Sequence, residues 1–187
     1  MKAMVISGSR NPQGQTARAT DGLVAGLKSG GATSEVAYLP TLRIERCRQC
    51  DAAGWGLCRT EGRCVIEDDF AGLVEKLRAA DLAVFATPVY FADLSESLRA
   101  FLDRLRRICR HDAGKVGLAG KPALGICVAG GGGGGAPNCT LSLEKFLTGP
   151  CAFAVADMVP VRKQNLELKI ELLRATGQWL AGQKQGQ

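Results

Sequence analysis

A short apolar segment that passes directly into a polar, glycine-containing loop constrains this chain more than any other feature. Met4 to Ile6 carry no charge, as expected for a strand that is buried on both faces of a sheet. The next ten residues, Ser7 to Thr16, are mostly polar or glycine, and a helical pattern then runs from Ala17 to Leu27. A strand, a polar loop and a helix N-terminus in this order predict an anion-binding loop of an α/β domain.

The side chains of this loop suit a phosphate. Ser7, Ser9, Gln15 and Thr16 are small hydrogen-bonding groups, Arg10 is a forked cation, and Thr16 is expected to cap the following helix. The loop lacks both the Gly-Lys-Ser/Thr ending of nucleoside-triphosphate loops and the Gly-x-Gly-x-x-Gly dinucleotide spacing. A monophosphate ester is the predicted ligand, and an ordinary strand-to-helix turn is the alternative.

Strand-like and helix-like segments alternate along the rest of the chain. Further strands are predicted at residues 35–39, 82–87, 123–129 and 152–160. Helical spacing of apolar residues links Phe70, Leu73, Val74 and Leu77, and also Leu98, Phe101, Leu102 and Leu105. We therefore predict an α/β fold in which helices cover both faces of a five-stranded parallel sheet of order 2-1-3-4-5.

Two more segments are expected at the edge of the sheet where the polar loop lies. Strand order 2-1-3-4-5 places the switch point between strands one and three, so the loop meets Pro88, Val89, Tyr90 and Phe91. The Val89 N–H and the two aromatic rings could face a flat ligand ring, although Tyr-Phe at a strand end is also common in cores. Gly130 to Gly135 follow the fourth strand, and they could be either a mobile loop or a backbone surface against that ring.

Length and composition limit the organisation of the chain. At 187 residues with 46% hydrophobic residues, it should form one domain, which we place at residues 1–181 with a polar tail at 182–187. No apolar run approaches the roughly eighteen residues of a membrane span, so we expect no membrane segment and a cytoplasmic location. The formal charge is +6, but the cations are scattered, and nucleic-acid binding is not favoured.

Three motifs together give the chain a resemblance to a known family. They are Ser7-Gly8-Ser9-Arg10 with Gly14-Gln15-Thr16, Phe85 to Phe91 after Asp81, and Ser97 to Arg104. This combination resembles the NAD(P)H-dependent FMN reductase family of flavodoxin-like proteins over residues 3 to 160. The resemblance implies a flavodoxin-like three-layer sandwich, bound FMN, reduction by NADH or NADPH, and a homodimer or homotetramer.

The resemblance also implies roles for particular residues. Ser9, Arg10, Gln15 and Thr16 would hold the FMN phosphate, with Ser7 beside them. The flavin ring would lie against Pro88, Val89, Tyr90, Phe91, Gly130, Gly131 and Gly132. Asp103 and Arg104 match an Asp-Arg pair of the family, for which a helix-surface or subunit-contact role and a catalytic role are both open. No general acid or base is assigned, because hydride transfer does not require one.

A cysteine-rich segment at residues 47–64 is the second distinctive feature. Cys47, Cys50, Cys58 and Cys64 resemble the metal ligands of the iron-sulfur flavoprotein branch of the same superfamily, which carries a 4Fe-4S cluster. The chain departs from that branch between Cys50 and Cys58, where seven residues intervene instead of the usual two. Ala53 stands at the expected third-cysteine position. A zinc site, a reversible disulfide and plain thiols are the alternatives.

The four remaining cysteines have a simpler interpretation. Cys109, Cys127, Cys139 and Cys151 are far apart in sequence, and Cys127 and Cys151 fall inside apolar runs. We predict that they are small core residues.

The leading functional prediction is an FMN-dependent oxidoreductase that takes a hydride from NAD(P)H. It would pass electrons to a small-molecule or redox-protein acceptor, through a 4Fe-4S cluster if the four cysteines hold one. The alternatives are a non-enzymatic electron carrier of the flavodoxin type and an NAD(P)H:quinone reductase without a cluster. Such carriers are commonly acidic, whereas this chain is basic.

Overall fold

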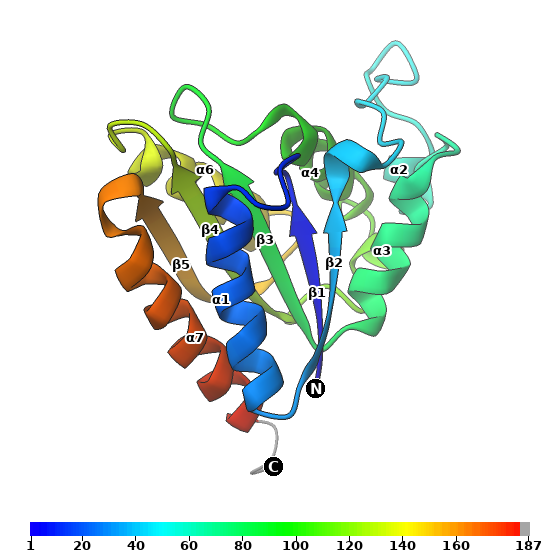
Figure 1. Ribbon diagram of the computed structural model, residues 1–187. Coiled ribbons are helices and arrows are strands. Elements are labelled where there is room, and N and C mark those ends of the chain that lie inside the picture. Colours follow the sequence, from blue (N-terminus) through cyan, green and yellow to red (C-terminus); the bar gives the residue numbers. More distant parts are fainter. Residues whose placement is uncertain (184–187) are drawn as a thin grey trace.

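Five parallel strands form the centre of the molecule. The structure is a computed structural model that describes residues 1–183 (Figure 1). The strands are β1 (Lys2–Ser7), β2 (Thr33–Tyr38), β3 (Leu82–Pro88), β4 (Pro122–Ala129) and β5 (Ala154–Arg162). They pair in the order β2-β1-β3-β4-β5, and every pairing is parallel, so the predicted fold class is confirmed. β1, β3 and β4 are almost fully buried because helices cover both faces, which explains their unbroken apolar sequences.

Helices form a layer on each face of the sheet (Figure 1). One layer contains α1 (Gln15–Ser29) and α7 (Leu166–Gln183), and the other contains α3 (Asp69–Ala79), α4 (Glu96–Ile108) and α6 (Ala136–Thr148). The shorter elements, which the sequence did not predict, are η1 (Leu39–Thr41), α2 (Leu57–Thr60), α5 (Asp112–Lys115) and η2 (Lys163–Asn165). None of the helices within residues 1–183 is long and apolar enough to cross a membrane.

Details at the ends of these elements differ from the predictions in two places. α1 begins at Gln15, with Gly14 as its N-cap and no side-chain capping bond, so the predicted capping role of Thr16 is wrong. Gly182 and Gln183 belong to α7, and the remainder of the predicted tail lies outside the described residues. The prediction for the isolated cysteines is confirmed, since Cys109, Cys127, Cys139 and Cys151 are all completely buried.

Helices α1 and α7 approach each other so closely that glycine is required between them. A Cβ atom at Gly26 would lie 1.9 Å from the Arg174 carbonyl oxygen, and one at Gly177 would lie 2.4 Å from the Leu23 carbonyl oxygen. Both obstacles are backbone atoms, which cannot rotate away as a side chain could. The two helices therefore pack backbone to backbone over one face of the sheet.

This contact leads to a stability prediction. We expect Gly26→Ala to lower the free energy of unfolding by about 1–3 kcal/mol, because the added methyl group forces α1 and α7 apart. Gly72→Ala in α3 is the matched control, since a Cβ atom there has no neighbour within 4 Å. Alanine has the higher helix propensity, so the control should gain about 0.5–1 kcal/mol. Urea unfolding of both variants measures the difference, and equal stability of the two would contradict the prediction.

Candidate functional site

The polar loop after β1 is anchored against the start of α4. The Gly8 N–H donates a 2.8 Å hydrogen bond to the Ala86 carbonyl oxygen of β3, and the Ser97 hydroxyl donates a 3.1 Å bond to the Gly8 carbonyl oxygen. A Cβ atom at Gly8 would lie 2.2 Å from the Ser95 hydroxyl oxygen, which caps α4. Glycine is thus needed at Gly8 because of this close approach, and the loop leaves the sheet at the predicted switch point.

The polar groups of this loop gather at the N-terminus of α1. Ser7, Ser9 and Thr16 are buried, and the Ser9 N–H donates a 3.3 Å bond to the Ser7 hydroxyl oxygen. Arg10 is exposed and forms no ion pair with any residue of the described chain. Since no side chain caps α1, its first N–H groups remain available for an anion. The loop therefore combines the exposed Arg10 cation, buried hydroxyl groups and the uncapped N-terminus of α1.

A buried amide lies between this loop and the glycine run. The Oε1 atom of Gln15 is buried and has no hydrogen-bond partner in the described part of the chain. A Cβ atom at Gly130 would lie 3.9 Å from it, and one at Gly131 or Gly132 would have no neighbour within 4 Å. An unpartnered buried amide beside open backbone is the arrangement expected where a polar ligand completes the structure.

The loop after β3 forms a tight turn that exposes its aromatic side chains. Tyr90 and Asp93 exchange backbone hydrogen bonds of 3.0 and 2.9 Å, while Phe91 and Ala92 have positive φ angles of 48° and 64°. Tyr90 is 50% exposed and Phe91 is fully exposed, so these two residues are not part of the core. The Val89 N–H donates to the Val128 carbonyl oxygen, so it is not free for a ligand as the sequence suggested.

The turn also contacts the glycine run. A Cβ atom at Gly135, the N-cap of α6, would lie 2.7 Å from the Cα atom of Ala92. The structure thus brings together three separate segments of the predicted flavin site: the loop after β1, the turn after β3 and the glycines after β4. All of them lie at the carboxyl edge of the sheet (Figure 1).

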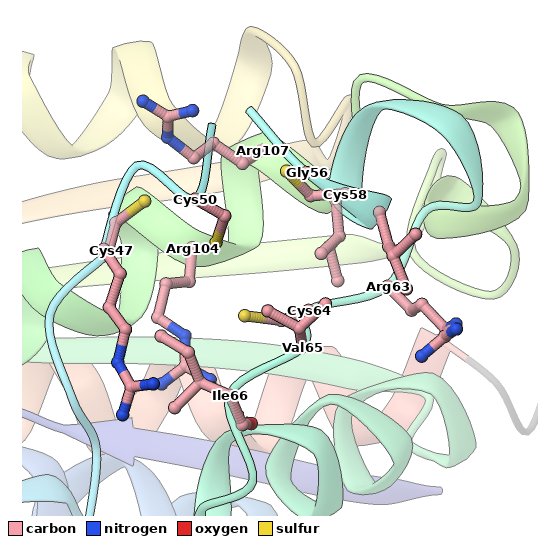
Figure 2. A pocket seen from close by; sticks show the side chains of 13 residues that line it. Cys47, Cys50, Gly56, Cys58, Arg63, Cys64, Val65, Ile66, Arg104 and Arg107 are labelled. Atoms are coloured by element: carbon pink, nitrogen blue, oxygen red, sulfur yellow. Dashed lines mark hydrogen bonds between the residues drawn. The ribbon is translucent and has the colours of Figure 1, made fainter. Parts of the chain in front are cut away.

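The four cysteines of the cysteine-rich segment line a single pocket. Cys47 and Cys50 lie in the irregular stretch between η1 and α2, Cys58 lies in α2, and Cys64 lies between α2 and α3. The pocket measures about 320 Å³ with its solvent-open part, and Arg104 and Arg107 of α4 also line it. Figure 2 shows the four sulfur atoms distributed around this space. All eight cysteines of the chain are free thiols.

The inserted residues between Cys50 and Cys58 are folded onto α4. The Arg107 guanidinium lies 4.8 Å above the Trp55 ring and donates a hydrogen bond to the Gly54 carbonyl oxygen. The Asp51 carboxylate accepts a 2.8 Å bond from the Trp55 N–H. A cation–π contact and these hydrogen bonds give the insertion a defined position. The inserted residues therefore do not prevent Cys50 and Cys58 from lining the same pocket.

Electrostatics also link the cysteines to one another. Burial raises the pKa of the Cys58 thiol, and the neighbouring Cys47 and Cys64 raise it further, whereas the Arg107 cation acts in the opposite direction. Cys58 is therefore protonated at neutral pH, and a metal that binds it must displace the proton.

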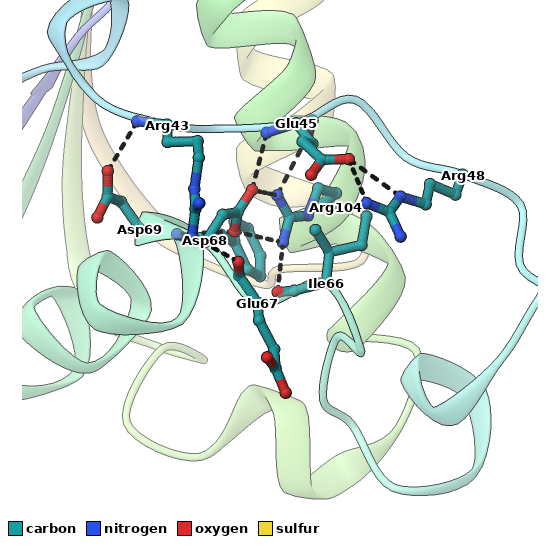
Figure 3. A network of polar contacts seen from close by, with 9 residues as sticks. Arg43, Glu45, Arg48, Ile66, Glu67, Asp68, Asp69 and Arg104 are labelled. Carbon is teal, nitrogen blue, oxygen red and sulfur yellow. Dashed lines mark hydrogen bonds and ion pairs between the residues drawn. The ribbon is translucent and has the colours of Figure 1, made fainter.

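A buried ion pair fixes both ends of the cysteine-rich segment (Figure 3). Arg104 and Asp68 form two hydrogen bonds, at 2.6 Å and 2.9 Å, and their side chains are at most 1% exposed. Asp68 also accepts a 2.8 Å bond from the Glu45 N–H and caps α3 through the Phe70 N–H. Arg104 additionally donates to the carbonyl oxygens of Glu45 and Ile66. Residues just before Cys47 and just after Cys64 are thereby held to α4.

The two residues of the Asp-Arg pair on α4 lie in different environments. Asp103 lies at the surface, where its carboxylate pairs with Arg106 at 2.9 Å. Arg104 is 1% exposed and stacks 4.2 Å from the Phe70 ring, so a helix-surface role for this residue is wrong. Burial alone would lower the Arg104 pKa, but the hydrogen bonds to Asp68 and the nearby Cys64 raise it. Arg104 is thus a permanent buried cation at the cysteine pocket.

The geometry of the four thiols can be tested against the groups that they might bind. A zinc ion holds its sulfur ligands at about 2.3 Å, which brings all of them close together. Within residues 1–183, no three or more His, Cys, Asp or Glu side chains converge tightly enough for a single metal ion. The sulfur atoms instead surround a pocket that four arginines also line, and two of these, Arg104 and Arg107, have a buried Nε atom without a partner in the described chain. Four thiols and unused N–H donors are the groups that would hold an anionic cluster at this pocket.

The fold and the geometry at the carboxyl edge of the sheet define a class of protein: a doubly wound α/β domain with a polar loop and an uncapped helix N-terminus at its switch point. Comparison with known families makes the class specific. The family model described as NADPH-dependent FMN reductase matches residues 1–165. The chain therefore belongs to the NADPH-dependent FMN reductase family, and the resemblance seen in its sequence is confirmed.

Curated relatives carry the same name in several organisms. An iron-sulfur flavoprotein of Methanocaldococcus jannaschii is 33% identical over 163 residues, which cover 86% of this chain and 75% of that protein. A second one from the same organism is 32% identical over 70% of this chain, and the match spans only 65% of its own length. The iron-sulfur flavoprotein of Methanosarcina thermophila is 27% identical over 79% of this chain and 73% of that protein.

Solved structures agree on the fold. An NAD(P)H:quinone oxidoreductase from Methanothermobacter marburgensis has a TM-score of 0.70 at 19% identity, with 96% of each chain covered. RosB with a bound riboflavin-5'-phosphate derivative has a TM-score of 0.71 at 22% identity and covers 100% of this chain and 81% of that one. At these identities the likeness concerns the arrangement of the sheet and helices.

Proposed function

We propose that this protein is an FMN-dependent oxidoreductase that takes a hydride from NAD(P)H and passes electrons onward through a 4Fe-4S cluster. The cluster would be held by Cys47, Cys50, Cys58 and Cys64. The observation that supports it most strongly is that these thiols line one pocket together with four arginines, although the insertion separates Cys50 from Cys58 in sequence. The iron-sulfur names of the relatives point in the same direction.

The proposed FMN site uses the three segments at the carboxyl edge of the sheet. Ser7, Ser9, Arg10 and Thr16 would hold the phosphate at the uncapped start of α1, and the unpartnered Gln15 amide would bind beside Gly130. Bound FMN accepts two electrons with a hydride and can release them singly. The remaining site residues would position the ring: Pro88, Val89, Tyr90, Phe91, Gly130, Gly131 and Gly132.

Each part of the chain has a limited task in this scheme. The glycine run offers backbone N–H groups and no side chains, so it can lie close to the ring and stabilise negative charge there. The exposed Tyr90 and Phe91 would cover the ring and exclude water. Arg104 and Arg107 would compensate the negative charge of four thiolates.

We also propose that residues 1–181 act as one FMN-binding domain and that the protein assembles as a homodimer or homotetramer. Phe91 supports this assembly, because a fully exposed aromatic ring on a strained turn would gain from burial by a second subunit. The acceptor would be a small molecule or a redox protein.

The absorption spectrum of protein purified without air tests the proposal. We expect flavin bands above a broad sulfur-to-iron absorption, and bleaching of the flavin bands when NADPH is added to the same cuvette. Flavin bands alone would leave an FMN or quinone reductase without a cluster. A flavin that NADPH cannot reduce would indicate an electron carrier, and a protein that binds no FMN would contradict the proposal altogether.

A further inference from the structure

One hydrogen-bond donor of the buried Arg104 is left unused by the ion pair. The two terminal amino groups of its guanidinium are fully occupied by Asp68 and by the carbonyl oxygens of Glu45 and Ile66. Its Nε atom is buried and has no hydrogen-bond partner in the part of the chain that the structure describes. Such a donor costs about 1–3 kcal/mol unless it finds an acceptor.

The Cys64 thiol lies on the pocket side of Arg104. Both Arg104 and Cys64 line the cysteine pocket, and Figure 2 shows the Cys64 sulfur on the same side of the arginine side chain as its Nε atom. The guanidinium cannot turn away, because Asp68 holds its far edge through two bonds and Phe70 stacks on its face at 4.2 Å. The free N–H is therefore fixed in a direction toward the pocket.

We propose that the Arg104 Nε–H donates a hydrogen bond to the Cys64 thiolate or an adjacent sulfide of the cluster, and so sets the reduction potential of that cluster. This inference rests on the proposed function, since it assumes that the four thiols hold a cluster. Hydrogen bonds to cluster sulfur and nearby positive charge both stabilise the more negative, reduced state. Arg104 would thus have two roles: its ion pair with Asp68 holds the cysteine-rich segment in place, and its Nε–H influences the reduction potential of the cluster.

Arg107 has a different relation to the pocket. It is half-buried, and its guanidinium lies over Trp55 and donates to the Gly54 carbonyl oxygen of the insertion. Its Nε atom is also buried without a partner in the described chain, so Arg107 is the competing donor. We expect the directional hydrogen bond to come from Arg104, which the ion pair with Asp68 holds in place, and Arg107→Met on the same helix separates the two donors.

The first experiment needs no substitution. The intact protein is labelled with nitrogen-15 at arginine Nε, purified without air, reduced with dithionite and examined by pulsed electron paramagnetic resonance. We expect a nitrogen-15 coupling to the cluster and an exchangeable proton that disappears in heavy water. Both signals should remain in Arg107→Met and vanish in Arg104→Lys, in which the lysine ammonium can still pair with Asp68.

A redox titration gives the second readout. We expect the equilibrium constant for one-electron reduction of the cluster to fall about tenfold in Arg104→Lys, equivalent to a potential about 59 mV more negative. The FMN potential in the same sample should not change. A cluster signal without nitrogen coupling in the intact protein, or an unchanged potential in a folded Arg104→Lys variant, would overturn the inference and leave the proposed function standing. Protein without iron and acid-labile sulfide would overturn both.

Discussion

Replacing both Cys58 and Cys64 by alanine should remove all cluster iron from the protein while FMN stays bound. The two residues line the same pocket from different sides, and the loss of both leaves only two thiols there, too few for a cubane cluster. We expect iron to fall from about four atoms per chain to near zero, because a four-iron cluster needs four protein ligands. Metal analysis, sulfide analysis and the flavin absorption of the same sample measure this outcome.

The matched control for this variant is the pair Cys109→Ala and Cys127→Ala. Both cysteines are completely buried and lie outside the cysteine pocket, so the double substitution should leave the iron content unchanged. Zinc in the unsubstituted protein in place of iron would refute the cluster. Equal iron in the two double variants would mean that the metal is held somewhere other than the cysteine pocket.

Removal of the Asp68 carboxylate is expected to cause the largest loss of stability. In Asp68→Ala the buried Arg104 cation loses the carboxylate that balances its charge and keeps only bonds to carbonyl oxygens among the described residues, while the Glu45 N–H loses its acceptor. Breaking a fully buried ion pair on one side costs about 3–5 kcal/mol. Asp69→Ala is the matched control, because Asp69 is exposed and accepts a single bond from the Arg43 N–H. The control should lose at most about 1 kcal/mol in urea unfolding.

The Asp68 prediction also has a pH dependence. Burial raises the pKa of Asp68, but the hydrogen bonds from Arg104, Glu45 and Phe70 outweigh it, and the pKa in the folded protein is lowered. The ion pair therefore contributes its stability above the ordinary aspartate pKa, about 3.9, and loses it as the pH falls through the lowered value. The difference between the original protein and Asp68→Ala should shrink below that range. A difference that is constant with pH would contradict the assigned role of the pair.

The sheet could be predicted from the sequence because the signals for it are local. β1, β3 and β4 are unbroken apolar segments, and each is followed by a helix with regular apolar spacing. Connections between parallel strands are almost always right-handed, and few strand orders are common, so the sequence predicted the strand order 2-1-3-4-5. That strand order also predicted where the polar loop after β1 lies. The roles of the individual flavin-site residues stay predictions. The structure supports them through the buried Gln15 amide and the open glycine backbone.

The sequence was misleading where a residue's role depends on distant neighbours. A helix-surface role was open for Arg104 as part of an Asp-Arg pair, yet Arg104 is buried against Asp68, thirty-six residues earlier in the chain. Val89 looked like a free donor, yet its N–H pairs with Val128 of β4. The acidic stretch Glu67 to Asp69 was the only local signal that a buried cation might need a partner.

The sequence by itself determined the fold, the family and the set of four thiols. All three follow from residue type and from spacing along the chain, because these two properties determine secondary structure and the choice of ligand residues. Only the tertiary structure decided that the insertion leaves Cys50 and Cys58 at one pocket, and that Arg104 is buried beside this pocket in an ion pair with Asp68. The reason is physical: burial, ion pairing and the direction of a free N–H arise from contacts between segments that are remote in sequence.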